Sequence, residues 1–134
     1  MINQLSQIKW GRVALTALVV YILSFVTVFI IVTGYASYLA FQMRGAPDQT
    51  LIQVFANRYG PWIGPISLIL FTVFGAMHMA RHVDNATQLH GIILGVLVSS
   101  VDIIFGGSLG LDVLLTTILT IGAGWLGSRL STSK

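Results

Sequence analysis

Three histidines are the residues whose type and spacing come closest to ligand chemistry. His78 and His82 are four residues apart, so they share one face if this segment is helical, and His90 follows after a polar turn. Imidazoles in such an arrangement can hold a divalent metal, and a single imidazole can bind a haem or a chlorin. No H-E-x-x-H motif accompanies them, because the chain contains no Glu. We therefore predict neither a metal nor a cofactor, and keep the three histidines as alternative candidates for binding a haem or a pigment.

Asp102 and Asp112 are the only acidic residues within or beside apolar runs of the sequence. A charged carboxylate in hydrocarbon costs at least about 2.5 to 3.5 kcal/mol, so each residue is a candidate ion or proton site. Asp102, however, lies within about one turn of the end of its apolar run. Asp112 falls in the first turn of the next run, where its negative charge favours the helix dipole. Interfacial or capping roles are the prediction, and an ion or proton site is the alternative.

Catalytic constellations are missing from the sequence. It has no Cys, which excludes disulfides, thiolate metal sites and thiol catalysis. We find no Ser, His and Asp arrangement, no paired carboxylates and no phosphate-binding glycine loop after a strand. The glycines between Gly106 and Gly110 join two apolar runs, so they form a turn. The sequence therefore predicts that the protein is not an enzyme and has no catalytic residues.

The elements that must position these residues are membrane helices. Of the 134 residues 55% are hydrophobic and only 8% are charged, far from the composition of soluble domains. A helix needs about 20 apolar residues to cross a bilayer, so four spans use nearly the whole chain. Seven scattered Lys and Arg residues form no basic stripe, which excludes a nucleic-acid partner. We predict a single all-α domain over residues 1–134, an integral membrane four-helix bundle.

The apolar runs, and the Gly, Pro and polar residues between them, predict five helical segments. Four spans are expected at about 13–40, 61–81, 88–105 and 111–128. Between the first two, residues 48–59 are expected to form a short amphipathic helix that lies in the membrane interface and stops at Gly60-Pro61. Pro61 and Pro65 then fall in the first turn or so of the second span. The apolar residues that share a face of the interfacial helix are Leu51, Ile52 and Phe55.

The distribution of positive charge predicts the orientation. With the N-terminus in the cytoplasm, the inner segments carry five basic residues and the outer ones carry only Arg44 and Arg58. Because cytoplasmic segments are enriched in Lys and Arg, this bias favours a multi-pass protein of the inner (plasma) membrane with both termini in the cytoplasm. The five inner basic residues are Lys9, Arg12, Arg81, Arg129 and Lys134.

Small residues recur at intervals of four in the last two spans. This spacing lines one helix face with small side chains, so two backbones can approach closely where lipid supplies no hydrophobic drive. Packing within the bundle is the prediction, and a surface for a second copy or a partner subunit is the alternative. The residues are Gly91, Gly95 and Ser99 in the third span, and Thr120, Gly124 and Ser128 in the fourth.

The segment from Gly75 through Arg81 to Leu89-His90-Gly91 and Gly95 resembles the middle of a family of small four-helix bacterial membrane proteins of unknown function. In that family an Ala-Arg end of the second helix also precedes a Leu-His-Gly opening of the third. The resemblance covers roughly the second to fourth helices. It implies a plasma-membrane bundle and no assigned activity.

These observations predict a non-catalytic accessory or assembly subunit of a larger membrane complex. Its expected partners are the lipid bilayer and either other membrane protein subunits or further copies of itself. Two alternatives stay open. The first is a small oligomeric transporter or ion channel that uses Asp102, Asp112 or both. The second is a haem- or pigment-binding subunit that uses the histidines.

Overall fold

The computed structural model describes residues 8–82, 87–106 and 110–132. Four α-helices account for nearly all of this described part, and no strand occurs in it. The predicted all-α, four-helix architecture is therefore confirmed. The helices are α2 (Trp10–Met43), α3 (Gln49–Ala80), α4 (Thr87–Gly106) and α5 (Leu111–Thr132).

Length and composition make this chain a membrane protein. Three helices, α2, α3 and α5, are long and apolar enough to cross a bilayer. Helix α4 is apolar too, but it is shorter, at 20 residues. Helix α2 extends beyond the predicted span 13–40 at both ends, and α5 extends beyond 111–128 at its C-terminal end.

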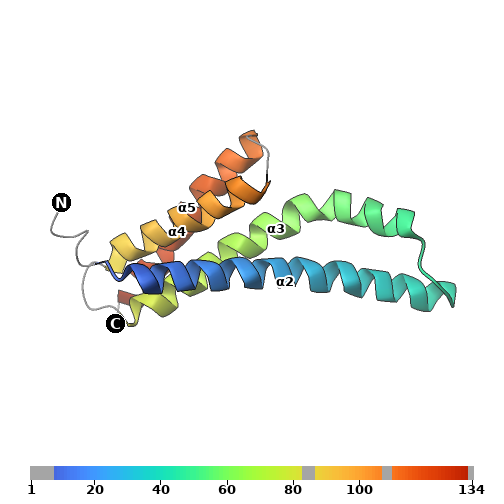
Figure 1. Cartoon of the computed structure of the whole chain (residues 1–134), viewed down its shortest axis with the longest axis horizontal. Coiled ribbons are helices and arrows are strands. Elements are labelled where there is room, and N and C mark those ends of the chain that lie inside the picture. The colour runs from blue at the N-terminus through green and yellow to red at the C-terminus, as the bar shows by residue number, and fades with distance from the viewer. Residues whose placement is uncertain (1–7, 83–86, 107–109, 133–134) are drawn as a thin grey trace.

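One part of the prediction was wrong, because residues 48–59 do not form a separate interfacial helix. They are helical, but α3 continues through Gly60, and Pro61 and Pro65 lie in its interior. Each proline lacks an N–H, so each removes one hydrogen bond of the helix. The first turns of α3 nevertheless stay helical, because they pack against α2 through the stacked rings of Phe55 and Tyr35. Figure 1 shows that α3 stays continuous and bends along its length.

The start of α2 is joined to the start of α4. The backbone N–H of Lys9, just before α2, donates to Nε2 of the buried His90 at 3.2 Å. Both helices run away from this point in the same general direction (Figure 1). At about 1.5 Å per residue, the 34 residues of α2 span about 51 Å and the 20 residues of α4 about 30 Å. The hairpin of α2 and α3 therefore continues well beyond the far ends of α4 and α5.

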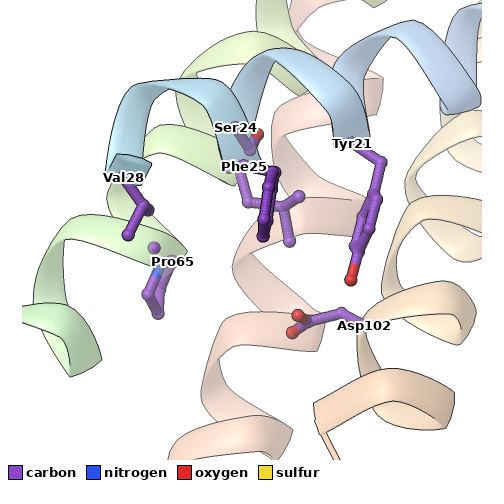
Figure 2. Close-up of a pocket in the computed structure, with 8 residues that line it drawn as sticks. Tyr21, Ser24, Phe25, Val28, Pro65 and Asp102 are labelled. Carbon is purple, nitrogen blue, oxygen red and sulfur yellow. The ribbon is translucent and has the colours of Figure 1, made fainter. Parts of the chain in front are cut away.

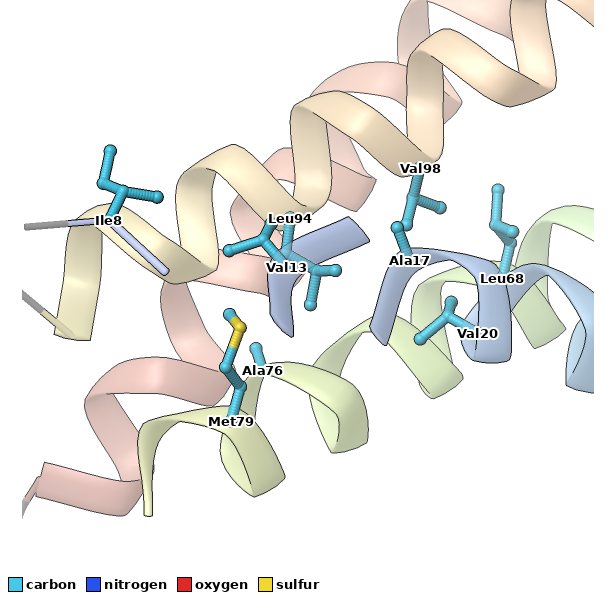
Figure 3. Close-up of a cluster of buried hydrophobic side chains, with 9 residues drawn as sticks. All are labelled: Ile8, Val13, Ala17, Val20, Leu68, Ala76, Met79, Leu94 and Val98. Carbon is cyan, nitrogen blue, oxygen red and sulfur yellow. The ribbon is translucent and has the colours of Figure 1, made fainter. Parts of the chain in front are cut away.

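The apolar core lies in the half of the bundle where α2 begins (Figure 3). Leu94 and Val98 of α4 are fully buried there, against the first half of α2 and the second half of α3. In a bilayer this contact is maintained by close packing rather than by removal of apolar surface from water. The buried apolar residues of the core are Ile8, Val13, Ala17, Val20, Leu68, Ala76, Met79, Leu94 and Val98.

The glycines of α4 and α5 face one another. A Cβ built on Gly91 would fall on the carbonyl oxygen of Gly124, and one built on Gly95 would lie 2.7 Å from the Cα of Ile121. No side chain larger than hydrogen fits at these places without moving a backbone. The small faces are thus used inside the bundle, which leaves them covered rather than free for a second copy. The other small residues of the pattern are also buried: Ser99, Thr120 and Ser128.

The hairpin of α2 and α3 is closed at its far end by a turn and a ring stack. Arg44 ends α2 in the left-handed conformation, with φ 51° and ψ 34°, and its N–H donates to the carbonyl of Ala40. The rings of Tyr35 in α2 and Phe55 in α3 stack with their centroids 4.0 Å apart. Phe55, which the sequence places on the apolar face of 48–59, therefore packs against α2.

Candidate functional site

The two acidic candidates line the same groove, which has a volume of about 470 Å³ and lies between α3 and α5. Asp102 reaches it from α4 and is partly buried, whereas Asp112 is exposed in the first turn of α5. The sequence predicted that both acids lie near the turn between the last two helices, but not that they share a space. We call this space the acidic groove. Its α3 wall consists of Pro61, Trp62, Pro65, Ile66 and Ile69.

Asp102 also lines a smaller cavity of about 150 Å³ on its other side, between α2 and α3. Figure 2 shows the hydroxyl of Tyr21 and the carboxylate of Asp102 pointing into the same space. Pro65 lines both this cavity and the acidic groove. Asp102 and Pro65 thus lie where the two hollows adjoin. The remaining walls of the smaller cavity are Ser24, Phe25, Val28, Gly64 and Leu68.

The two prolines remove two backbone hydrogen bonds of α3 beside this region. In an α-helix the N–H of each residue donates to the carbonyl four residues earlier. Pro61 and Pro65 have no N–H, so the carbonyls of Asn57 and Pro61 lack these donors. Pro61 itself lines the acidic groove.

The chemistry of the acidic groove suits a cation. Two carboxylates are oxygen ligands, and the indole of Trp62, which is 70% exposed, offers a π face that attracts positive charge. Most of the other walls are apolar. The groove can therefore hold a cation, exchange a proton, or accept a cation that carries an apolar body.

His78 and His82 lie side by side at the opposite end of the bundle. Their ring centroids are 4.8 Å apart, and Nδ1 of His82 donates to the carbonyl of His78 at 2.8 Å. A carbonyl can only accept, so Nδ1 of His82 must carry the proton. Arg12 of α2 donates from its guanidinium to the carbonyl of His82 at 2.9 Å. The predicted shared face is present, and it brings the pair beside Arg12 rather than beside the acids.

His90 is separate from the other two histidines in its environment. It is fully buried, and its Nε2 accepts the hydrogen bond from the N–H of Lys9. That lone pair is engaged, so this nitrogen cannot ligate a haem or a metal without releasing the start of α2. Within the described residues no group of three or more His or Asp side chains is placed to hold a metal ion.

The projecting hairpin, residues 33–59, exposes large apolar side chains. It lies beyond the reach of α4 and α5, as judged from the helix lengths and Figure 1. Phe41 is 86% exposed and Val54 is 57% exposed. The hydrocarbon core of a bilayer is about 30 Å thick and cannot cover a straight helix of about 51 Å. Part of this apolar surface therefore lies outside the hydrocarbon unless the helix tilts strongly.

Several residues of these surfaces could not be found from the sequence as site residues. Trp62 and the two prolines carry the signals of a helix start at the outer membrane interface. The predicted topology puts the acids on that same side, but these signals do not mark Trp62 or the prolines as site residues. The available signal was the spacing of Pro61 and Pro65, which are four residues apart and so share a helix face. In the sequence, Arg12 contributes only to the charge bias that predicts the orientation. Nothing in one sequence shows that its guanidinium reaches the end of α3.

No family model, no curated protein and no solved structure matches this chain. The likeness of residues 75–95 to small four-helix bacterial membrane proteins therefore stays a prediction from the sequence. Three features of the described residues remain to indicate function: the acidic groove, the projecting hairpin and the Arg12 end of the α2 and α3 pair.

Proposed function

We propose that the protein is a non-catalytic accessory or assembly subunit of a larger membrane complex, and that the projecting hairpin is its docking surface. The observation that carries this proposal is the mismatch between the helices. The hairpin of α2 and α3 is about 20 Å longer than α4. Among the polar residues of its end it still exposes large apolar side chains, such as Phe41 and Val54. Apolar surface outside the hydrocarbon is unfavourable unless another protein covers it.

The internal packing supports the same proposal. The small faces of α4 and α5 are occupied by each other, so they offer no surface to a partner, whereas Phe41 and Val54 of the hairpin are exposed. In the most apolar stretch of α2 only 17% of the residues are buried within the chain. Lipid covers the part of this surface in the bilayer. Other subunits would cover the part beyond it.

Site-specific photo-crosslinking tests this function. A photoreactive phenylalanine analogue at Phe41 should form an adduct with a protein of one defined mass, because Phe41 is the most exposed apolar residue of the hairpin. The same analogue at Ile118 of α5, which is 68% exposed, is the control and should react with lipid. Adducts with lipid alone at both positions would contradict a docking role for the hairpin. An adduct of twice the chain mass would instead indicate a homo-oligomer.

A small transporter or channel is the second candidate, because both acids line one groove with Trp62. Replacing Asp102 by Asn preserves its shape and removes its charge. If the acidic groove conducts or exchanges a cation, Asp102→Asn should abolish flux in proteoliposomes while the fold is kept. Asp48→Asn in the hairpin is the control and should leave flux unchanged. A parent protein without flux would exclude this candidate.

We also place the protein in the plasma membrane, with the end that carries the start of α2 in the cytoplasm. The basis is the excess of Lys and Arg at that end. For the haem or pigment alternative, Nε2 of His90 already accepts from Lys9, and the described residues contain no group of three or more metal-binding side chains.

A further inference from the structure

Two hollows between α2 and α3 run into one another near the start of α2. The first has a volume of about 220 Å³ and the second about 350 Å³. Both are lined by Leu15, Thr16 and His78, so they form one continuous groove along the helix pair. We call it the lipid groove. It is separate from the acidic groove, with which it shares no lining residue.

One end of the lipid groove is basic. Arg12, His78 and His82 line it, and no acidic side chain of the described residues lines any part of the groove. Two backbone carbonyls hold these side chains in place: that of His82 accepts from Arg12 at 2.9 Å, and that of His78 accepts from His82 at 2.8 Å. A guanidinium has five N–H donors, so a single such bond leaves others that can bind an oxyanion.

The rest of the lipid groove is apolar and follows the helix axes toward the middle of the bundle. From Leu15 to Leu23 along α2 the distance is about 12 Å at about 1.5 Å per residue. Half of a hydrocarbon core is about 15 Å, so the groove fits within one leaflet. Its apolar walls include Leu15, Val19, Leu23, Phe71 and Phe74.

We propose that this groove binds one anionic glycerophospholipid. The headgroup phosphate lies against Arg12 and the two histidines, and one acyl chain lies between α2 and α3. The order of the walls carries the assignment: fixed positive charge at the end of the helices, then an apolar channel about as long as one leaflet is deep. A free phosphate would contact the basic end alone and would leave the apolar part unfilled. This assignment does not depend on the proposed docking role of the hairpin.

Native mass spectrometry of the full chain in nanodiscs tests the proposal. In nanodiscs of mixed phosphatidylglycerol and phosphatidylcholine, the protein should retain one phosphatidylglycerol in preference to phosphatidylcholine. Arg12→Gln should weaken that retention about fivefold, the effect expected for one basic residue at an anionic lipid surface. Arg81→Gln is the matched control, because Arg81 lies at the same end of α3, is exposed, and lines neither hollow.

A second pair of variants tests the apolar channel without disturbing the core. Val19 lines the channel and is 45% exposed, so Val19→Trp should fill the channel and lower lipid retention while leaving the fold intact. Leu18→Trp is the control on the neighbouring, more exposed position, at 57%. Thermal unfolding in detergent verifies that all four variants fold. Equal retention of both lipids, or equal effects within either pair of variants, would overturn the proposal.

Discussion

The backbone N–H of Lys9 and Nε2 of His90 are joined by a hydrogen bond of 3.2 Å across 81 residues of sequence. This bond sets the first turn of α2 level with the first turn of α4. It also explains why a histidine is tolerated in a fully buried position, because a buried polar group needs a partner. The projection of the α2 and α3 hairpin follows from this alignment, since the two parallel helices start together and differ in length.

His90 should therefore be a stability residue. Replacing it by Leu leaves the N–H of Lys9 without its acceptor, so the free energy of unfolding should fall by about 1 to 3 kcal/mol. Gln can offer an amide oxygen, so His90→Gln should lose less. Chemical unfolding in a mild detergent measures both. Variants as stable as the parent would show that this bond contributes nothing.

The contact of α4 with α5 predicts opposite results for two glycines of the same helix. A Cβ on Gly124 would fall on the carbonyl oxygen of Gly91, whereas one on Gly122 would meet nothing within 4 Å. Gly124→Ala should destabilise the protein by about 1 to 3 kcal/mol through overpacking. Gly122→Ala should be neutral or stabilise it by up to about 1 kcal/mol through helix propensity. Thermal unfolding that gave both variants the same midpoint would contradict the predicted contact.

Removing the hydroxyl of Ser99 should stabilise the protein. Its Oγ is buried and has no hydrogen-bond partner, and such an atom costs about 1 to 3 kcal/mol. Ser99→Ala should therefore raise the midpoint of thermal unfolding. Ser24 is the matched control, because it is equally buried but donates to the carbonyl of Val20 at 2.9 Å. Ser24→Ala should lower the midpoint or leave it unchanged, and the reverse order of the two variants would be the contradictory result.

The proposed orientation can be tested with single cysteines, because the chain has none of its own. Ala46 lies in the turn between α2 and α3, and Arg81 follows α3 at the opposite end, both of them exposed. With both termini in the cytoplasm, an impermeant maleimide should label Ala46→Cys in intact cells. Arg81→Cys should react only after permeabilisation. The opposite labelling pattern would invert the topology.

The start of α3 should respond to acid. Oδ1 of Asp48 accepts from the N–H of Thr50 at 2.8 Å, and hydrogen bonding with Thr50 lowers the pKa of Asp48 below its usual value of 3.8. Because the folded-state pKa is lowered, the cap is fully formed above pH 3.8 and is lost as the pH falls through the lower value. The amide resonance of Thr50 should titrate with a midpoint below 3.8. Asp48→Asn should abolish this titration and keep the cap.

The helices and the small-residue faces could be predicted because each depends on local sequence. Apolar length defines a membrane helix, and residues four apart share a helix face, so Gly91 and Gly95 could be assigned to an interface before its partner was known. The helix end predicted at Gly60-Pro61 was wrong, for a physical reason. Proline removes a helix hydrogen bond and usually marks a helix end, but the segment before Pro61 packs against α2 through Phe55 and Tyr35, and local sequence does not reveal this tertiary contact.

The sites could be predicted only as separate residues. Asp102 and Asp112 are ten positions apart on different helices, and the wall that completes their common groove comes from α3, about forty residues earlier in the sequence. His90 is a residue type that can bind a metal or a haem. In the fold, however, it accepts a hydrogen bond from the backbone N–H of Lys9, near the start of the chain. Such pairings arise from tertiary packing, so local spacing does not reveal them.

Burial along α2 is uneven, and this has a consequence for local opening. Val13, Ala17, Val20 and Ser24 are buried, but no residue from Phe25 to Tyr38 is. Local unfolding costs least where buried contacts are few. Amide hydrogens of the projecting hairpin that lie in water should therefore exchange sooner than those beside the core. A subunit that docks on the hairpin would slow this exchange selectively, so exchange rates would report the binding of a partner before its identity is known.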